Sequence, residues 1–167
     1  MYDELTKNDI KKIEEEIEYR KVVVRKEALE AVKEARAHGD LSENFEYHAA
    51  KKDKNKNESR IRYLERMVRT AKIIEDRSAD DEVGLFNTVT LYMEDDDEEE
   101  TYRLVTTVRG NSLQGRISIE SPLGKAILGR RLGERVYVAV SERAGYYVEI
   151  RAIEKTADDG SDTLRSF

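Results

Sequence analysis

The sequence contains no cysteine and no tryptophan, and its single proline is Pro122. Without cysteine, the chain has neither a disulfide framework nor a thiolate metal site. It also lacks any apolar run of the roughly 20 residues needed to cross a bilayer, and its acidic start, Met1–Glu4, is unlike a signal peptide. These absences predict a soluble, cytoplasmic protein that is not associated with a membrane.

Apolar residues are scarce relative to charged ones. Charged residues make up 40% of the 167 positions, and the formal net charge is -6. Too few apolar side chains remain to fill one large core, whereas a long exposed helical element tolerates such charge. The negative net charge argues weakly against general DNA binding, although it conceals local differences in charge.

The first 77 residues contain one glycine, Gly39, which predicts two long helices with a single interruption. Apolar residues recur at spacings of three and four in both halves. Those of the first half are Ile10, Ile13, Ile17, Ala28, Leu29, Val32 and Ala35, with a shift of phase around Val22–Val24; those of the second are Ile61, Leu64, Val68 and Ala71. A turn near residues 39–42 would place Ile17 near Leu64. Residues 1–77 are therefore predicted to form an antiparallel coiled-coil hairpin.

From about Val83 the apolar period changes to two, which is typical of strands. The segments with this pattern are Phe86–Met93, Tyr102–Val108, Arg116–Ile119, Arg135–Val140 and Tyr146–Ile153. Ser121 and Pro122 are suited to start a short helix that Gly129 ends. Residues 82–155 are therefore predicted to form a small β-rich domain with one short helix, and the whole chain is predicted to be α+β.

Three further features complete the predicted organisation. The boundary between the two domains is expected near Arg77–Asp81. The acidic segment Glu94–Glu100 is expected to be a solvated hairpin loop. The polar residues 156–167 are predicted to form a disordered tail.

Asp40 and Glu43 lie three residues apart in the predicted turn of the hairpin. Carboxylate oxygens suit Mg²⁺, which usually takes one or two protein carboxylates and fills its octahedron with water or phosphate oxygens. A second molecule would have to complete so weak a site, and the shared metal could activate water for phosphodiester hydrolysis. The alternative interpretation is that Asp40, Ser42 and Glu43 only cap the second helix.

The stretch from Lys51 to Lys72 contains nine basic and three acidic residues, a local balance of +6. Such a cluster of cations attracts an RNA backbone, but a solvated helix face with ordinary charge pairs explains the count equally well. Arg36 would approach this stretch from the opposite arm. Tyr47 is a candidate stacking platform for a base, although packing across the hairpin is the simpler role.

Two longer motifs resemble those of a known family. The run from Glu34 to Lys51, EARAHGDLSENFEYHAAK, resembles the signature of the GreA/GreB transcript elongation factors. A second run from Gly115 to Gly129, GRISIESPLGKAILG, is similar to the carboxy-terminal signature of that family. The resemblance covers about residues 5–155, and the two motifs lie in the order that the family has.

The resemblance implies a coiled coil followed by a domain of FK506-binding-protein-like fold, which docks at the secondary channel of bacterial RNA polymerase. The matching residues Asp40 and Glu43 would hold a Mg²⁺ ion jointly with the polymerase, and no metal is expected in the free protein. The factor would be a monomer and not itself an enzyme. It would stimulate the polymerase's own cleavage of backtracked nascent RNA and so rescue arrested complexes.

The resemblance also implies contacts to the extruded RNA 3′ end. Arg36 and Lys51 match positions that make such contacts in the family. The neighbouring Lys52 and Tyr47 complete the predicted RNA-contacting set.

Three departures from the family pattern support an alternative function. Phe45 stands where the family usually has a small residue, Lys52–Asn57 replaces a Glu/Gln-rich stretch, and Arg25–Lys26 replaces a common Arg-Pro pair. A divergent relative of this kind could occupy the channel and inhibit or modulate transcription without stimulating cleavage. A third hypothesis, peptidyl-prolyl isomerisation, requires an aromatic-lined pocket, yet Phe86 is the only phenylalanine in the second domain.

Overall fold

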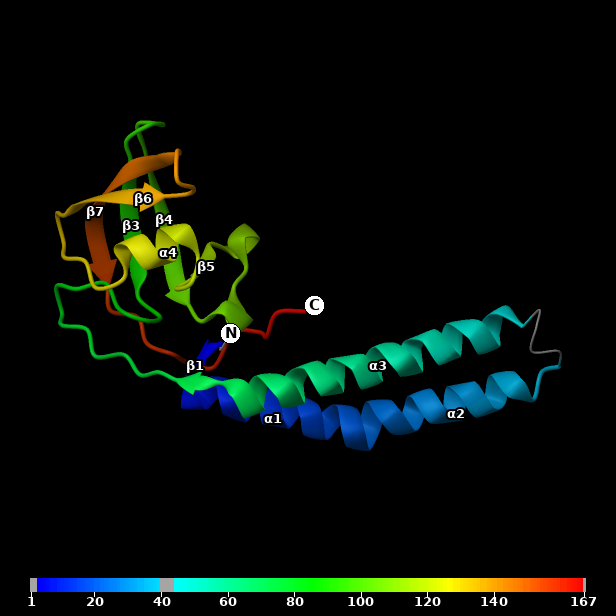
Figure 1. Cartoon of the computed structure of the whole chain (residues 1–167). Helices are drawn as coiled ribbons and strands as arrows, with labels where there is room; N and C mark the ends of the chain where they lie inside the picture. The colour runs from blue at the N-terminus through cyan, green and yellow to red at the C-terminus, as the bar shows by residue number, and fades with distance from the viewer. Residues whose placement is uncertain (1–2, 40–43, 167) are drawn as a thin grey trace. The chain divides into compact units, whose positions relative to one another are not determined.

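The structure is a computed structural model, and it describes residues 3–39 and 44–166. The chain forms two compact units (Figure 1). One unit contains Asn8–Ala71, and the other contains Glu4–Lys7 together with Lys72–Ser166. The first is helical and the second is rich in β-strands, so the predicted α+β fold class is confirmed. No helix within these described residues combines the length and apolar character that a membrane span requires.

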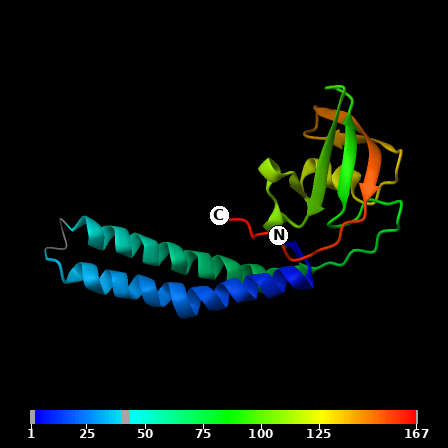
Figure 2. The same cartoon turned by 180° about the vertical axis from the view of Figure 1, so that it is seen from behind.

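The helical unit is a hairpin of two long arms. The first arm comprises α1 (Lys7–Tyr19), a π-helical segment η1 (Arg20–Val24) and α2 (Arg25–Arg36), and the second arm is the single helix α3 (Phe45–Thr70). The arms lie side by side over their length in both views (Figures 1 and 2). The predicted helical hairpin is therefore confirmed.

The π-helical segment η1 coincides with the shift of phase around Val22–Val24. A π-helical turn contains more residues than an α-helical turn, so it rotates the apolar positions that follow it. After η1, the inward-facing positions are Ala28, Val32 and Ala35, and Ala35 is buried. The prediction that Leu29 belongs to the seam was wrong, since its side chain is 49% exposed.

The space between the arms changes from apolar to polar along the hairpin. Ile13, Ile61, Leu64 and Met67 form the buried apolar part. Beyond it, Asn57 and Arg60 of α3 are also buried, at 4% and 5% exposure. Burying such groups is tolerated only when they are hydrogen-bonded.

Glu16 of α1 is the centre of this buried polar layer. Its carboxylate accepts hydrogen bonds from Nε of Arg60 and from Nε of Arg20, both at 2.8 Å. Arg20 also donates to Oδ1 of Asn57 at 3.0 Å, so the network joins both arms. Burial alone would raise the pKa of Glu16, but the two arginine hydrogen bonds outweigh it and hold the pKa below its usual value.

The Glu16→Gln variant should lose roughly 2 kcal/mol of hairpin stability, because it removes the negative charge that accepts hydrogen bonds from the buried Arg60. For the wild type, the folded-state pKa of Glu16 lies below the unfolded one, so its contribution is present at neutral pH and is lost as the pH falls through the folded pKa. Urea unfolding followed by helical circular dichroism measures both effects. A Glu16→Gln protein as stable as the wild type at neutral pH would contradict this role.

The second unit is built on a five-stranded sheet with the order β5-β4-β3-β7-β6. The strands are β3 (Thr88–Met93), β4 (Glu98–Val105), β5 (Arg116–Ser118), β6 (Arg135–Ala139) and β7 (Gly145–Glu154). Only the β4–β5 pair within this sheet is parallel. Glu98–Glu100 belong to β4, so the acidic hairpin loop is shorter than predicted and is limited to residues 94–97.

Helix α4 (Pro122–Ile127) begins as predicted. The hydroxyl of Ser121 accepts a hydrogen bond from the backbone N–H of Gly124 at 3.1 Å, and Pro122 occupies the first turn. A Cβ on Gly124 would lie 1.9 Å from the carbonyl oxygen of Ser118 at the end of β5. Glycine at this position therefore lets α4 pack directly against the sheet, where Leu123 and Ile127 join the core.

The division between the two units lies earlier than the predicted boundary at Arg77–Asp81. A short strand β1 (Glu4–Leu5) pairs in parallel with β2 (Lys72–Ile73) and belongs to the second unit. The backbone N–H of Ile74 donates to the carbonyl of Leu5 at 2.8 Å, and Ile74 packs on the β core. These contacts were not predicted, because two-residue strands carry no periodic signal.

Residues 156–166 pack on the β unit, in contrast to the disordered tail predicted from their composition. Arg109, in the 3₁₀ segment η2 (Thr107–Arg109), is fully buried and donates to both carboxylate oxygens of Asp158, at 2.7 and 2.8 Å. Arg103 of β4 donates to both oxygens of Asp162 at 2.6 and 2.5 Å, and Arg116 of β5 lies 3.7 Å from the same carboxylate. We call residues 156–166 the C-terminal strap. Arginines that are distant in the sequence thus hold the strap against the β unit.

The Asp162→Asn variant should destabilise the β unit by roughly 3 kcal/mol, since it removes one charge from a buried ion cluster. Asp159→Asn is the matched control, because this neighbouring carboxylate lies on an exposed residue of the same strap. Calorimetric unfolding compares the two variants. Equal transition temperatures for Asp162→Asn and the wild type would exclude the strap as a stabilising element.

Candidate nucleic-acid interface

The candidate site predicted from the sequence is the distal end of the hairpin. Its two carboxylates, Asp40 and Glu43, lie outside the residues that the structure describes. The described residues next to them, Arg36 at the end of α2 and Asn44 at the start of α3, define the site's immediate surroundings.

Asn44 joins the two arms where they approach the tip. Its side-chain oxygen accepts a hydrogen bond from the backbone N–H of Tyr47 at 3.0 Å, which caps α3. Its side-chain nitrogen donates to the carbonyl oxygen of Ala35 in α2 at 2.6 Å. The N-cap of α3 is thus Asn44; Asp40, Ser42 and Glu43, for which capping was the alternative interpretation, lie outside the described residues.

An aromatic and cationic group lies directly behind Asn44. The guanidinium of Arg36 lies 5.6 Å from the centre of the Tyr47 ring, and the His48 ring meets the Tyr47 ring edge-on at 5.5 Å between centres. A hydrogen bond with Arg36 lowers the pKa of Tyr47, and the positive charge of Lys51 lowers it further. The structure therefore brings together three of the predicted RNA-contacting residues, Arg36, Tyr47 and Lys51.

The exposed face of α3 carries a row of cations. Its members are Lys51, Lys52, Arg62, Arg66 and Arg69, all exposed. Spacings near multiples of 3.6 place Lys51, Arg62, Arg66 and Arg69 on the side of the helix opposite the buried Leu64 and Met67, and Lys52 lies at the edge of that side. None of the five forms an ion pair with another residue in the described part of the chain. We call this row the cationic stripe.

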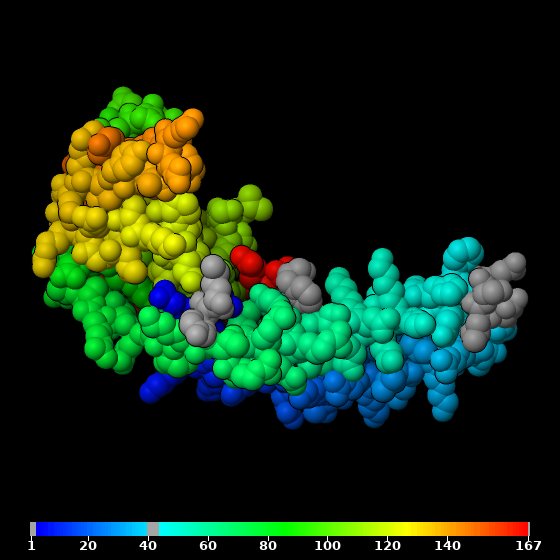
Figure 3. Space-filling view, viewed as in Figure 1, coloured from blue at the N-terminus to red at the C-terminus, as the bar shows by residue number. Residues whose placement is uncertain are grey.

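Two acidic residues of α3, Glu58 and Glu65, form ion pairs with the first arm. Glu58 forms an ion pair with Arg25 at 2.9 Å, and Glu65 forms one with Lys21 at 2.5 Å. Both partners lie on the first arm, so these carboxylates are used to hold the arms together. The space-filling view shows the two arms in contact, with α3 side chains projecting from the hairpin (Figure 3). The five cations of the stripe therefore lie on one side of α3, whereas Arg60, which the count of +6 includes, is buried between the arms and paired with Glu16.

Sequence reasoning did not assign a role to Asn44, although an asparagine directly before a helix is a common N-cap signal. It also did not identify Arg25 and Lys21 as the partners of the acidic residues on α3, because cross-arm pairing depends on the register. Across residues 3–39 and 44–166, no group of three or more His, Asp or Glu side chains is arranged to hold a metal ion.

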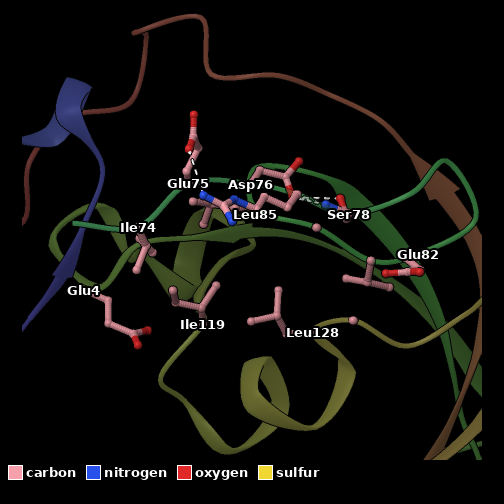
Figure 4. Close-up of a pocket in the computed structure, with 13 residues that line it drawn as sticks. Glu4, Ile74, Glu75, Asp76, Ser78, Glu82, Leu85, Ile119 and Leu128 are labelled. Carbon is pink, nitrogen blue, oxygen red and sulfur yellow. Dashed lines mark hydrogen bonds and ion pairs between the residues drawn. The ribbon is translucent and has the colours of Figure 1, made fainter. Parts of the chain in front are cut away.

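A separate cavity of about 330 Å³ lies in the β unit. Ile74, Leu85, Ile119 and Leu128 form its apolar walls, and Glu4, Glu75, Asp76 and Glu82 contribute carboxylates around it (Figure 4). No aromatic side chain lines this cavity. An isomerase site would require such a lining.

Phe86, the aromatic residue considered for an isomerase pocket, is 6% exposed. Its ring is faced by Arg109 at 4.7 Å and by Arg103 at 5.4 Å. The residue is therefore part of the core beneath the C-terminal strap and does not line the cavity of the β unit.

The described residues combine a helical hairpin that carries exposed cations on α3 with a mixed β-sheet domain. Comparison with known families identifies the class of protein with this architecture. The family model "Transcription elongation factor, N-terminal" matches residues 4–73, and "Transcription elongation factor, GreA/GreB, C-term" matches residues 78–155. The chain belongs to the GreA/GreB family of transcription elongation factors, which are factors rather than enzymes.

Two GreA proteins agree with this assignment. Transcription elongation factor GreA of Geobacillus kaustophilus is 48% identical over 135 residues, which cover 80% of this chain and 85% of that protein. GreA of Bacillus subtilis is 44% identical over 134 residues, with the same coverage of 80% and 85%. Among solved structures, the GreA factor homolog 1 (Gfh1) protein of Thermus thermophilus is 27% identical and covers 92% of this chain and 99% of its own, with a TM-score of 0.43.

The electrostatic environment of the distal surface can be measured on Tyr47. Its phenol should titrate below its usual pKa of about 10, because Arg36 and the neighbouring lysines favour the phenolate. Arg36→Ala should move the pKa back toward the usual value, while Arg62→Ala, farther along α3, should change it little. NMR titration of ring-labelled tyrosines gives these values. A Tyr47 pKa unaffected by Arg36→Ala would show that the two side chains do not interact in solution.

Proposed function

We propose that this protein binds bacterial RNA polymerase through its secondary channel and stimulates cleavage of the backtracked nascent RNA 3′ end. This activity would rescue arrested transcription complexes. The proposal is supported by family membership and by relatives named transcription elongation factor GreA at 44–48% identity. It is also supported by the acidic pair within the motif that resembles the Gre signature.

The observation that carries the proposal is the separation of charge along the hairpin. The cationic stripe runs along α3, and the sequence places Glu43 directly before Asn44, the N-cap of α3, and Asp40 three residues before Glu43. Unpaired cations attract and position a phosphate backbone without reading its sequence. The two carboxylates at the end of the same arm would then be offered to one phosphodiester bond.

Asp40 and Glu43 are proposed to hold a Mg²⁺ ion jointly with the polymerase. Such an ion lowers the pKa of a bound water and stabilises the negative charge that develops on the phosphate oxygens. Carboxylate oxygens are the protein ligands that this ion prefers, and two of them leave positions for water, RNA and polymerase groups. The catalytic centre would belong to the polymerase, and the factor would complete it.

Arg36, Tyr47, Lys51 and Lys52 are proposed to contact the extruded RNA. Arg36 and Tyr47 already contact each other, so these side chains lose little conformational freedom when RNA binds. Lys51 and Lys52 are exposed in the first turns of α3 and extend the same positively charged surface. The protein would act as a monomer, because each polymerase channel would accept one hairpin.

The alternative, a channel-binding inhibitor without cleavage activity, is not favoured. The relatives with 44–48% identity are named elongation factors, and the acidic pair is retained. The departures at Phe45 and Lys52–Asn57 leave both carboxylates in place.

Asp40→Asn and Glu43→Gln should each reduce stimulated RNA cleavage at least about 100-fold, because each removes charge from a metal ligand while keeping its size. Binding to polymerase should change little. The assay measures shortening of labelled RNA in a defined backtracked complex with purified cognate polymerase. Glu46→Gln is the matched control, since Glu46 is an exposed carboxylate of the same region that pairs with His38 at 3.2 Å.

The wild-type result in the same assay separates the two functions. A cleavage stimulator shortens the stalled RNA, whereas an inhibitor depresses run-off synthesis and leaves that RNA intact. Undiminished cleavage by both carboxylate variants would refute the role of the acidic pair.

A further inference from the structure

Phe45, the first residue of α3, has an unusually exposed side chain. It is 86% exposed, whereas the next most exposed aromatic side chain within the described residues, Tyr19, is at 57%. No aromatic or cation–π contact to its ring occurs within that part of the chain, although Tyr47 and His48 nearby make such contacts. An exposed phenyl ring gains free energy whenever another surface covers it.

The surroundings of Phe45 indicate what kind of surface would cover it. His48, Lys52 and Lys56 follow it at intervals of three, seven and eleven residues, and all of them are exposed. These intervals place the four side chains on one face of α3, over roughly 16 Å at 1.5 Å per residue. An apolar surface of a protein that covered this face would have to remove water from Lys52 and Lys56 as well, which is unfavourable. A nucleotide chain offers both a flat ring and a phosphate, and it suits both features.

This inference rests on the proposed function and adds a positioning contact to it. We propose that Phe45 stacks on an unpaired nucleobase of the extruded RNA, while Lys52 and Lys56 attract the adjoining phosphates. Binding of single-stranded nucleic acid commonly combines aromatic platforms with such cations, and it tolerates every base because every base has a π face. Phe45 would thus hold the RNA next to the acidic pair without selecting its sequence. The contact does not involve the metal, since a phenyl ring has no ligand atom.

The test compares binding of each variant to two polymerase complexes, one with several nucleotides of extruded RNA and one that is not backtracked. Divalent metal is chelated, so that no RNA is cut during the measurement. Phe45→Ala should weaken binding to the backtracked complex by roughly 5- to 10-fold, which corresponds to the low end of one base–aromatic stack. Binding to the complex without extruded RNA should stay unchanged.

Substitutions at the same position distinguish stacking from general apolar contact. Phe45→Trp and Phe45→Tyr should retain wild-type affinity for the backtracked complex, whereas Phe45→Leu should resemble Phe45→Ala. Tyr19→Ala is the matched control, because it removes another exposed aromatic ring from the opposite arm. Because Phe45 is exposed, each variant should fold normally, which circular dichroism verifies.

Three results would overturn the proposal. The first is that Phe45→Ala binds both complexes as tightly as the wild type does. The second is that Phe45→Leu binds the backtracked complex as tightly as the wild type does. The third is equally weakened binding of both complexes by Phe45→Ala, which would assign Phe45 to a contact with the polymerase itself. Because binding is measured without cleavage, the two proposals can fail separately. A wild-type protein that fails to stimulate cleavage would refute the proposed function and leave the stacking proposal to the binding measurement.

Discussion

The antiparallel contact between α3 and the first arm is the interaction on which the rest of the hairpin depends. It buries Ile13 and Leu64 at one level and the Glu16–Arg60 pair at the next. An apolar contact alone would tolerate sliding between helices, whereas hydrogen bonds between charged groups at defined positions do not. The polar layer thus determines the register of the arms, and the register determines which residues of α3 face solvent. The exposed position of the cationic stripe is a result of that register.

The two units accommodate their many charges in different ways. In the hairpin, Glu58 and Glu65 of α3 pair across the arms, and the five cations of the cationic stripe form no ion pair among the described residues. In the β unit, arginines point inward and are neutralised by carboxylates of the C-terminal strap. The family match ends at residue 155, before the strap begins, so this arrangement uses residues outside the family pattern. The charged residues therefore have a different structural role in each unit.

Features with local signals were predictable from the sequence. The hairpin arms, the Ser121–Pro122 helix start and the positions of the five main strands follow from periodicity and capping. Features that depend on partners distant in the sequence were not predictable from it. The strap is polar and glycine-containing, yet buried Arg109 requires an anion, and Asp158 supplies it. At the candidate site, the motif predicted the carboxylates, which lie outside the described residues, and the basic residues next to them. It did not reveal that Asn44 bonds to Ala35, because that contact needs the arms to be paired first.

The π-helical segment at Arg20–Val24 has a consequence for how such hairpins tolerate changes in length. A π turn accommodates one residue more than an α turn over the same rise, so it absorbs an insertion without displacing the helix on either side. Deleting one residue from this segment should restore a regular α-helix while α1 and α2 keep their partners on α3. A length change anywhere in α3, which has no such segment, would instead rotate one half of that helix against its partner arm. Natural insertions and deletions should therefore be found in the first arm and not in the second.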